Sequence, residues 1–126
     1  MTLVYARFIG IIGLKTNEIP YKSSALAASY NGLKIVHFSD IHYKKAISNE
    51  KIEHLITEIN KIKPDIILFT GDLIDTSYEL TNKDNKFLIK ELSKLNSKYG
   101  NYAVLGDNDY LKEDTIKSIY IQSNFT

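Results

Sequence analysis

The sequence predicts an α/β fold, built on a mainly parallel sheet with flanking helices, and three observations predict it. The apolar segments 33–38, 66–69 and 102–105 run almost without alternation, which is typical of strands buried inside a sheet. Segments with apolar residues at helical spacing separate these strands. A turn rich in aspartate, asparagine and histidine follows each strand directly.

The composition is that of one globular domain or part of a larger one. The chain has 126 residues, of which 44% are hydrophobic and 25% are charged. Its 16 Lys and Arg residues nearly balance its 15 Asp and Glu residues, so no overall field favours nucleic acid or an anionic membrane. The nine tyrosines are scattered, which argues against a nucleic-acid stacking platform. The absence of cysteine excludes disulfides and thiol catalysis.

Residues 1–32 are expected to form an amino-terminal extended segment. β-Branched and aromatic residues favour strands there, with breaks expected at Gly10, Gly13 and Pro20. The apolar stretch 2–14 contains Arg7 and is shorter than the roughly 20 residues that a membrane span needs. We see neither a transmembrane segment nor a secretory signal, and expect a cytoplasmic protein or one peripheral to a membrane.

The first strand, 33–38, follows a turn at residues 30–32 and opens the part of the chain organised as strand-helix repeats, 33–126. A helix then precedes Pro64, with Ser48 or Asn49 as its cap. Its apolar residues recur every three or four positions, at Ile52, Leu55, Ile56, Ile59 and Ile62.

The strand at 66–69 leads to a second helix, expected over about 83–98, because Phe87, Leu88, Leu92 and Leu95 share one face and Gly100 follows. After the strand at 102–105, a last amphipathic helix is expected from about Asp114. It carries Ile116, Ile119 and Tyr120 toward the core. No internal repeat or linker indicates a second domain.

The three turns contain Asp40-Ile41-His42, Gly71-Asp72-Leu73-Ile74-Asp75 and Gly106-Asp107-Asn108-Asp109. Ligands gather at the carboxyl ends of parallel strands, because neighbouring strand ends bring distant residues together. Asp40 and His42 are two residues apart and are expected to face the same side. Carboxylate and imidazole groups bind divalent cations, so the turns predict a metal site in which Asp72 bridges two ions. Asp107 would be a ligand of the second ion alone.

Three segments of this sequence, 34–42, 68–75 and 102–110, resemble the first three motifs of the calcineurin-like metallophosphoesterase family. The resemblance covers about residues 33–110 and is closest to bacterial, often membrane-anchored phosphohydrolases. It implies the first half of a four-layer sandwich, so that residues 1–126 form a partial metallophosphoesterase domain. It also implies two divalent ions (Mn, Fe, Mg or Zn) and metal-dependent hydrolysis of a phosphate mono- or diester.

The resemblance assigns roles to individual positions. Asp40 and His42 match ligands of the first metal, Asp72 matches the bridging carboxylate, and Asp107 stands where the family usually has a ligating Asn. Asn108, the candidate catalytic residue, stands where the family places a His that protonates the leaving oxygen. An amide is no general acid near neutral pH. Asp109, which would orient that His, loses this role.

Other side chains near these motifs have plainer interpretations. Asp75 is expected to serve as a helix cap or turn former, and His37 as a core imidazole with its hydrogen bonds satisfied. Lys44 and Lys45 are expected to be a solvated charge pair. None of these residues is included in the predicted ligand set.

The family's later motifs, a downstream His and a Gly-His-x-His segment, have no match in this sequence, which contains no His after residue 110. We therefore expect an incomplete or weakly active fragment that takes a phosphate ester substrate. The uncovered sheet face would favour self-association or a complementing carboxyl-terminal half. Two alternatives are a non-catalytic metal-binding remnant and a flavodoxin-like binding domain.

Overall fold

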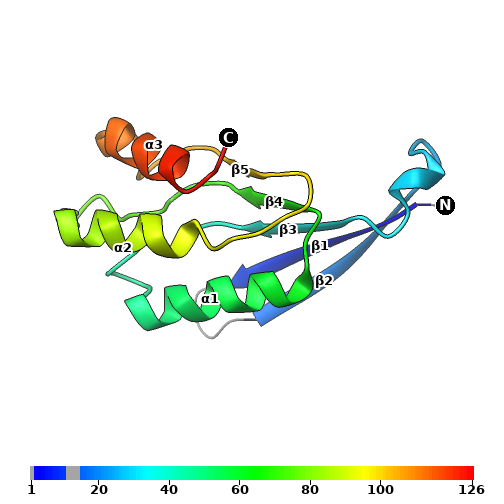
Figure 1. The fold of residues 1–126 in the computed structure, drawn as a ribbon, viewed down its shortest axis with the longest axis horizontal. Helices are drawn as coiled ribbons and strands as arrows, with labels where there is room; N and C mark the ends of the chain where they lie inside the picture. The colour runs from blue at the N-terminus through cyan, green and yellow to red at the C-terminus, as the bar shows by residue number, and fades with distance from the viewer. Residues whose placement is uncertain (1, 11–14) are drawn as a thin grey trace.

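A five-stranded sheet in the order β2-β1-β3-β4-β5 organises the computed structural model, which describes residues 2–10 and 15–126 (Figure 1). Strands β1, β3, β4 and β5 are parallel, and β2 pairs antiparallel with β1 at one edge. The mainly parallel sheet predicted from the sequence is therefore confirmed. The strands are β1 (Thr2–Gly10), β2 (Lys15–Ser23), β3 (Lys34–Phe38), β4 (Ile66–Phe69) and β5 (Asn101–Ala103).

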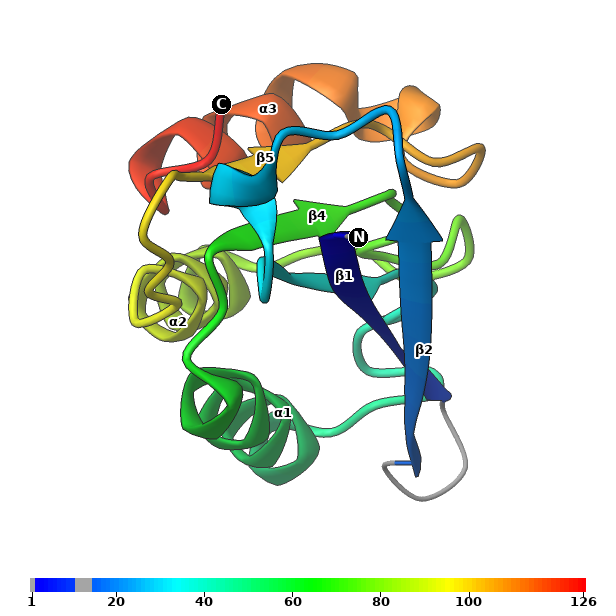
Figure 2. The same cartoon turned by 90° about the vertical axis from the view of Figure 1, so that its right-hand side faces the viewer.

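α-Helices connect β3 to β4 and β4 to β5 along the chain, and a third helix follows β5. Helix α1 (Asn49–Ile62) lies between β3 and β4, α2 (Asn82–Leu92) between β4 and β5, and α3 (Glu113–Gln122) after β5, as Figure 2 also shows. Two short 3-10 helices, η1 (Ala28–Tyr30) and η2 (Tyr110–Lys112), complete the order. No helix in the described ranges is long and apolar enough to cross a membrane.

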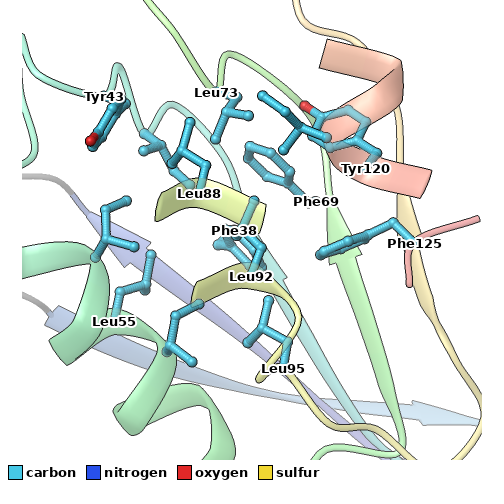
Figure 3. Packing of buried hydrophobic residues seen from close by; sticks show 14 of the residues in the cluster. Phe38, Tyr43, Leu55, Phe69, Leu73, Leu88, Leu92, Leu95, Tyr120 and Phe125 are labelled. Atoms are coloured by element: carbon cyan, nitrogen blue, oxygen red, sulfur yellow. The ribbon is translucent and has the colours of Figure 1, made fainter. Parts of the chain in front are cut away.

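The hydrophobic core lies between one face of the sheet and the three helices (Figure 3). Phe38 of β3 stacks on Phe69 of β4 with ring centroids 4.7 Å apart, and Tyr120 of α3 meets Phe69 edge-on at 5.6 Å. Helices α1 and α2 add Leu55 and Leu92 to the same cluster. This packing fixes β3 and β4 side by side, and with them the turns that follow.

The opposite sheet face is less covered. Ile35 of β3 and Leu68 of β4 are only partly buried, while Tyr102 of β5 is 42% exposed and Val104 is 59% exposed. These residues alternate with the buried ones along each strand, as expected for a sheet with one covered face.

Three sequence expectations differ from the structure at their boundaries. Helix α2 ends at Leu92 rather than near residue 98, because the chain then turns and the backbone N–H of Asn96 donates to Asn60 Oδ1. Strand β5 spans Asn101–Ala103 rather than residues 102–105, and the side-chain amide of the buried Asn101 donates to the Leu95 carbonyl. Pro20 lies inside β2 instead of ending it, since an edge strand tolerates a missing N–H.

The remaining boundaries agree with the sequence or fall outside the description. Strand β1 ends at Gly10, and the expected break at Gly13 lies outside the described residues. Helix α1 begins after Ser48 and stops before Pro64, with Lys63 in a left-handed conformation. The chain end runs beside β5, where the Ala103 N–H donates to the Thr126 carbonyl.

Candidate metal centre

Three turns meet at the carboxyl edge of the parallel strands. The turn after β3 carries Asp40 and His42, the turn after β4 carries Asp72, and the turn after β5 carries Asp107 and Asn108. A cavity of about 320 Å³ opens between them. Its lining residues come from all three turns: Ser39, Asp40, Thr70, Gly71, Asp72, Leu105, Gly106 and Asp107.

Asp40, His42 and Asp72 lie close enough to share one cation. One ligand atom of each residue lies within 4.8 Å of the others. The Nε2 atom of His42 is 3.7 Å from Asp40 Oδ1 and 3.8 Å from Asp72 Oδ2. Two carboxylates and one imidazole are a donor set that suits Mn²⁺, Fe²⁺ or Zn²⁺, so these residues fit a bound divalent cation.

All three candidate ligands have left-handed backbone conformations. The φ angles are 55° at Asp40, 42° at His42 and 57° at Asp72. Positive φ is uncommon outside glycine, although Asp and His adopt it more readily than most residues. Such strain persists only where the surroundings impose it, and it concentrates at functional sites. The sequence carries no local signal for this feature.

Backbone hydrogen bonds hold the first turn against the second. The Asp40 N–H donates to the Gly71 carbonyl and the His42 N–H donates to the Asp72 carbonyl, each at 3.0 Å. Next along the chain, the Tyr43 N–H donates to the Leu73 carbonyl at 2.9 Å. The two turns therefore continue the pairing of β3 with β4 past the end of the sheet.

Two glycines let the second and third turns touch. A Cβ atom placed on Gly71 would lie 2.0 Å from the Gly106 nitrogen, and one placed on Gly106 would lie 2.2 Å from Asp72 Oδ1. Gly71 also has a φ of 94°, which L-residues with side chains rarely adopt. The Gly-Asp pairs in both motifs thus have a steric role besides supplying carboxylates.

Asp109 lies in the third turn, is fully buried, and binds the backbone of the second turn through its carboxylate. Its Oδ2 accepts the N–H groups of Asp72 and Gly106, and its Oδ1 accepts that of Leu73, at 2.9–3.0 Å. Burial raises the pKa of Asp109, and these hydrogen bonds act in the opposite direction. Sequence reasoning missed this role, because a buried aspartate has no pattern that distinguishes it from an ordinary turn residue.

Asn108 contacts the carboxylate of Asp72. Its backbone N–H donates to Asp72 Oδ1 at 2.9 Å, and its side-chain Nδ2 donates to Asp72 Oδ2 at 2.8 Å. Both oxygens of the predicted bridging carboxylate therefore accept from one residue. The arrangement orients Asp72, and it places the Asn108 side chain beside the three candidate ligands.

Asp107 borders the same cavity but does not join the three-residue group. Its side chain is exposed, and the cluster of possible ligands among the described residues contains only Asp40, His42 and Asp72. The structure thus gathers three of the four metal ligands that the sequence predicts.

Asp75 and Lys45 share a contact beyond those expected, and His37 is not the core imidazole that the sequence predicts. Asp75 accepts from the Ser77 N–H at 3.0 Å, which is the expected turn role, and it also pairs with Lys45 Nζ at 2.8 Å. Lys45 is therefore more than a solvated cation. His37 is only partly buried, lies on the less covered sheet face and bonds Thr70 Oγ1 at 2.8 Å.

Comparison with known proteins points to one family. The family model of the calcineurin-like phosphoesterases matches residues 33–125. An uncharacterized metallophosphoesterase of Bacillus subtilis, YkuE, is 36% identical over 124 residues, which are 97% of this chain and 43% of that protein. A second uncharacterized metallophosphoesterase, Cj0846 of Campylobacter jejuni, is 36% identical over 86% of this chain and 27% of its own length.

One relative has a named activity. The UDP-2,3-diacylglucosamine pyrophosphatase LpxG of Chlamydia muridarum is 29% identical over 87% of this chain and 32% of that protein. The chain thus spans less than half the length of these relatives. No solved structure matches it significantly.

Proposed function

Because this chain belongs to the calcineurin-like phosphoesterase family, we propose that its carboxyl-edge turns form part of a divalent metal site for phosphate mono- or diester hydrolysis. The observation that supports this most directly is the approach of Asp40, His42 and Asp72 to within 4.8 Å of one another. The relative named as a pyrophosphatase supports hydrolysis at phosphorus more generally, since that activity breaks a phosphoanhydride rather than an ester.

In this proposal Asp40 and His42 would hold a first divalent cation, Asp107 would hold a second, and the Asp72 carboxylate would be a ligand of both. Bound divalent cations would neutralise phosphate charge and lower the pKa of an attacking water. Asp40 and Asp72 supply the negative charge that such cations require, and His42 supplies a neutral nitrogen ligand. Mn, Fe, Mg and Zn all remain candidates.

Asn108 limits the rate in this proposal. Its amide donates to Asp72 and has no proton to give to a departing alkoxide. Esters with good leaving groups need no such proton, so they are the substrates expected to react. The amide at residue 108 also supports a second candidate, a non-catalytic protein that binds a cation, because cation binding by Asp40, His42 and Asp72 needs no proton donor.

We also propose that further polypeptide, from a complementing carboxyl-terminal half or from a second copy of the chain, covers the exposed residues Tyr102 and Val104. The greater length of the relatives supports the first source. Sedimentation velocity tests whether a second copy of the chain covers these residues. A sedimentation coefficient of a monomer at all protein concentrations would contradict self-association. We place the protein in the cytoplasm or at the membrane periphery as part of this proposal.

The deciding experiment is hydrolysis of bis(p-nitrophenyl) phosphate with added Mn²⁺. We expect turnover by the wild-type chain and its loss in Asp72→Ala, while Asp114→Ala, which removes an exposed carboxylate of α3, retains the wild-type rate. Asn108→His restores a general acid and should raise the rate on poor leaving groups by about 10²-fold or more. Equal rates for the wild type and Asp72→Ala would refute the hydrolase and leave the cation-binding candidate.

A further inference from the structure

His42 has one nitrogen toward the candidate ligands and one away from them. Nε2 faces Asp40 and Asp72 at 3.7 and 3.8 Å. Nδ1 is buried and has no hydrogen-bond partner among the described residues, and the Oδ2 atom of Asp75 lies 3.6 Å from it. A neutral imidazole carries one proton, so the nitrogen that holds this proton determines whether Nε2 has a lone pair to offer a cation.

Asp75 is itself held in place on its other oxygen. Oδ1 accepts from the Ser77 N–H at 3.0 Å and from the Ser77 hydroxyl at 2.5 Å. Only 10% of the Asp75 side chain is exposed, so it has little freedom to turn away. The turn bonds with Ser77 therefore leave Oδ2 directed at the imidazole.

Lys45 provides a counter-charge for this carboxylate. Its Nζ lies 2.8 Å from Asp75 Oδ2, the oxygen that also faces His42. Without the Lys45 ammonium group, the Asp75 carboxylate would add to the electrostatic repulsion between Asp40 and Asp72. The ammonium group and the Ser77 bonds hold the pKa of Asp75 well below its usual range.

We propose that Asp75 is a positioning residue, which accepts the Nδ1 proton of His42 and so keeps the Nε2 lone pair directed at the cation site. Metal-binding histidines usually donate their second N–H to such an acceptor, and loss of that acceptor typically lowers metal affinity by about 10- to 100-fold. The inference rests on the proposed metal site, but the tautomer of His42 tests it without any metal.

Two variants separate positioning from turn formation. Asp75→Asn retains the shape and an oxygen for Ser77, but its amide group presents an N–H to Nδ1 instead of an acceptor. Ser77→Ala removes the hydroxyl bond to Oδ1 but keeps the backbone N–H bond to the same oxygen, so Oδ2 still faces His42. A purely structural Asp75 would make both variants less stable to heat and would leave the His42 tautomer unchanged in both.

The first readout is long-range ¹H–¹⁵N correlation on metal-free protein at about pH 8.5, two units above the ordinary histidine pKa. Single His→Gln variants assign the three imidazoles. We expect the Nδ1–H tautomer of His42 in the wild type and in Ser77→Ala, and a shift toward the Nε2–H tautomer in Asp75→Asn. A wild-type Nε2–H tautomer, or the same tautomer in all three proteins, would overturn the proposal.

The second readout is Mn²⁺ affinity by isothermal titration. We expect a loss of about 10- to 100-fold for Asp75→Asn with its melting temperature nearly retained, and a loss below about 3-fold for Ser77→Ala. Equal affinities in the wild type and Asp75→Asn would contradict the positioning role. Absence of Mn²⁺ binding in the wild type would instead refute the proposed function, and the tautomer measurement would still decide the role of Asp75.

Discussion

The first two turns and the third turn use the same residue types in different ways. Asp40, His42 and Asp72 direct their ligand atoms at one another and stay partly accessible. In the third turn, by contrast, the buried carboxylate of Asp109 accepts backbone N–H groups. Motif letters alone therefore do not separate a metal ligand from a structural support. The exposure of each side chain separates them, since Asp109 is fully buried and Asp40 and Asp72 are not.

The largest effect is expected where the second and third turns touch. Gly71→Ala places a Cβ 2.0 Å from the Gly106 nitrogen, so the backbone of one turn must move. We expect a loss of about 3–5 kcal/mol in the free energy of unfolding, measured by urea titration. Gly32→Ala is the matched control, since Gly32 also has a positive φ of 81° but nothing within 4 Å of its Cβ position. It should cost only about 1 kcal/mol.

Asp109 is expected to be nearly as important for stability. Asp109→Ala leaves the N–H groups of Asp72, Leu73 and Gly106 without their acceptor, which should cost about 3 kcal/mol in urea unfolding. Its exposed neighbour provides the control, because Asp107→Ala should change the free energy of unfolding by less than about 0.5 kcal/mol. A loss of similar size in both variants would remove the distinction between the support and the candidate ligand.

Asp84 is a buried carboxylate away from the candidate metal centre, and the pH dependence of the free energy of unfolding tests its structural role. Burial raises the pKa of Asp84, but hydrogen bonds from Thr81, Tyr78 and Tyr43 outweigh it and lower the value to about 2. Because the folded pKa lies below the unfolded value of about 4, this contribution is present above about pH 4 and lost between about pH 4 and 2. Asp84→Asn should flatten the pH dependence of stability over that interval, and an unchanged slope would contradict this assignment.

The smallest effect on stability is expected at His42, a candidate ligand with a positive φ. His42→Gly relieves a φ of 42° and should change the free energy of unfolding by no more than about 1 kcal/mol, while it lowers Mn²⁺ affinity at least 10-fold. Lys44→Gly relieves a φ of 67° two residues away and should leave Mn²⁺ affinity unchanged. Equal Mn²⁺ affinities in these two variants would show that His42 is not a ligand.

The fold was largely predictable because its signals are local. The apolar runs at 33–38 and 66–69 and the spacing of Ile52, Leu55 and Ile59 specify strands and a helix without tertiary information. The boundary at Leu92 was missed because it depends on the Asn96–Asn60 hydrogen bond, a contact between residues far apart in the sequence.

The site was predictable in part for the same reason. Asp40, His42 and Asp72 follow strand ends, and parallel strands bring these ends together. The support from Asp109 and the approach of Asp75 to His42 depend on burial and on side-chain direction across turns, which no spacing rule supplies. Asp107, by its motif position, was expected among the ligands, but its exposed side chain lies outside the three-residue group.

Pulsed electron paramagnetic resonance of the protein with Mn²⁺ added tests most directly whether Asp40, His42 and Asp72 share a cation. We predict that the electron spin echo of the wild type shows modulation by the nitrogen of one coordinated imidazole. This modulation should disappear in His42→Gln and persist in His37→Gln and His54→Gln. Bound Mn²⁺ without nitrogen modulation, or with modulation that persists in His42→Gln, would contradict the account.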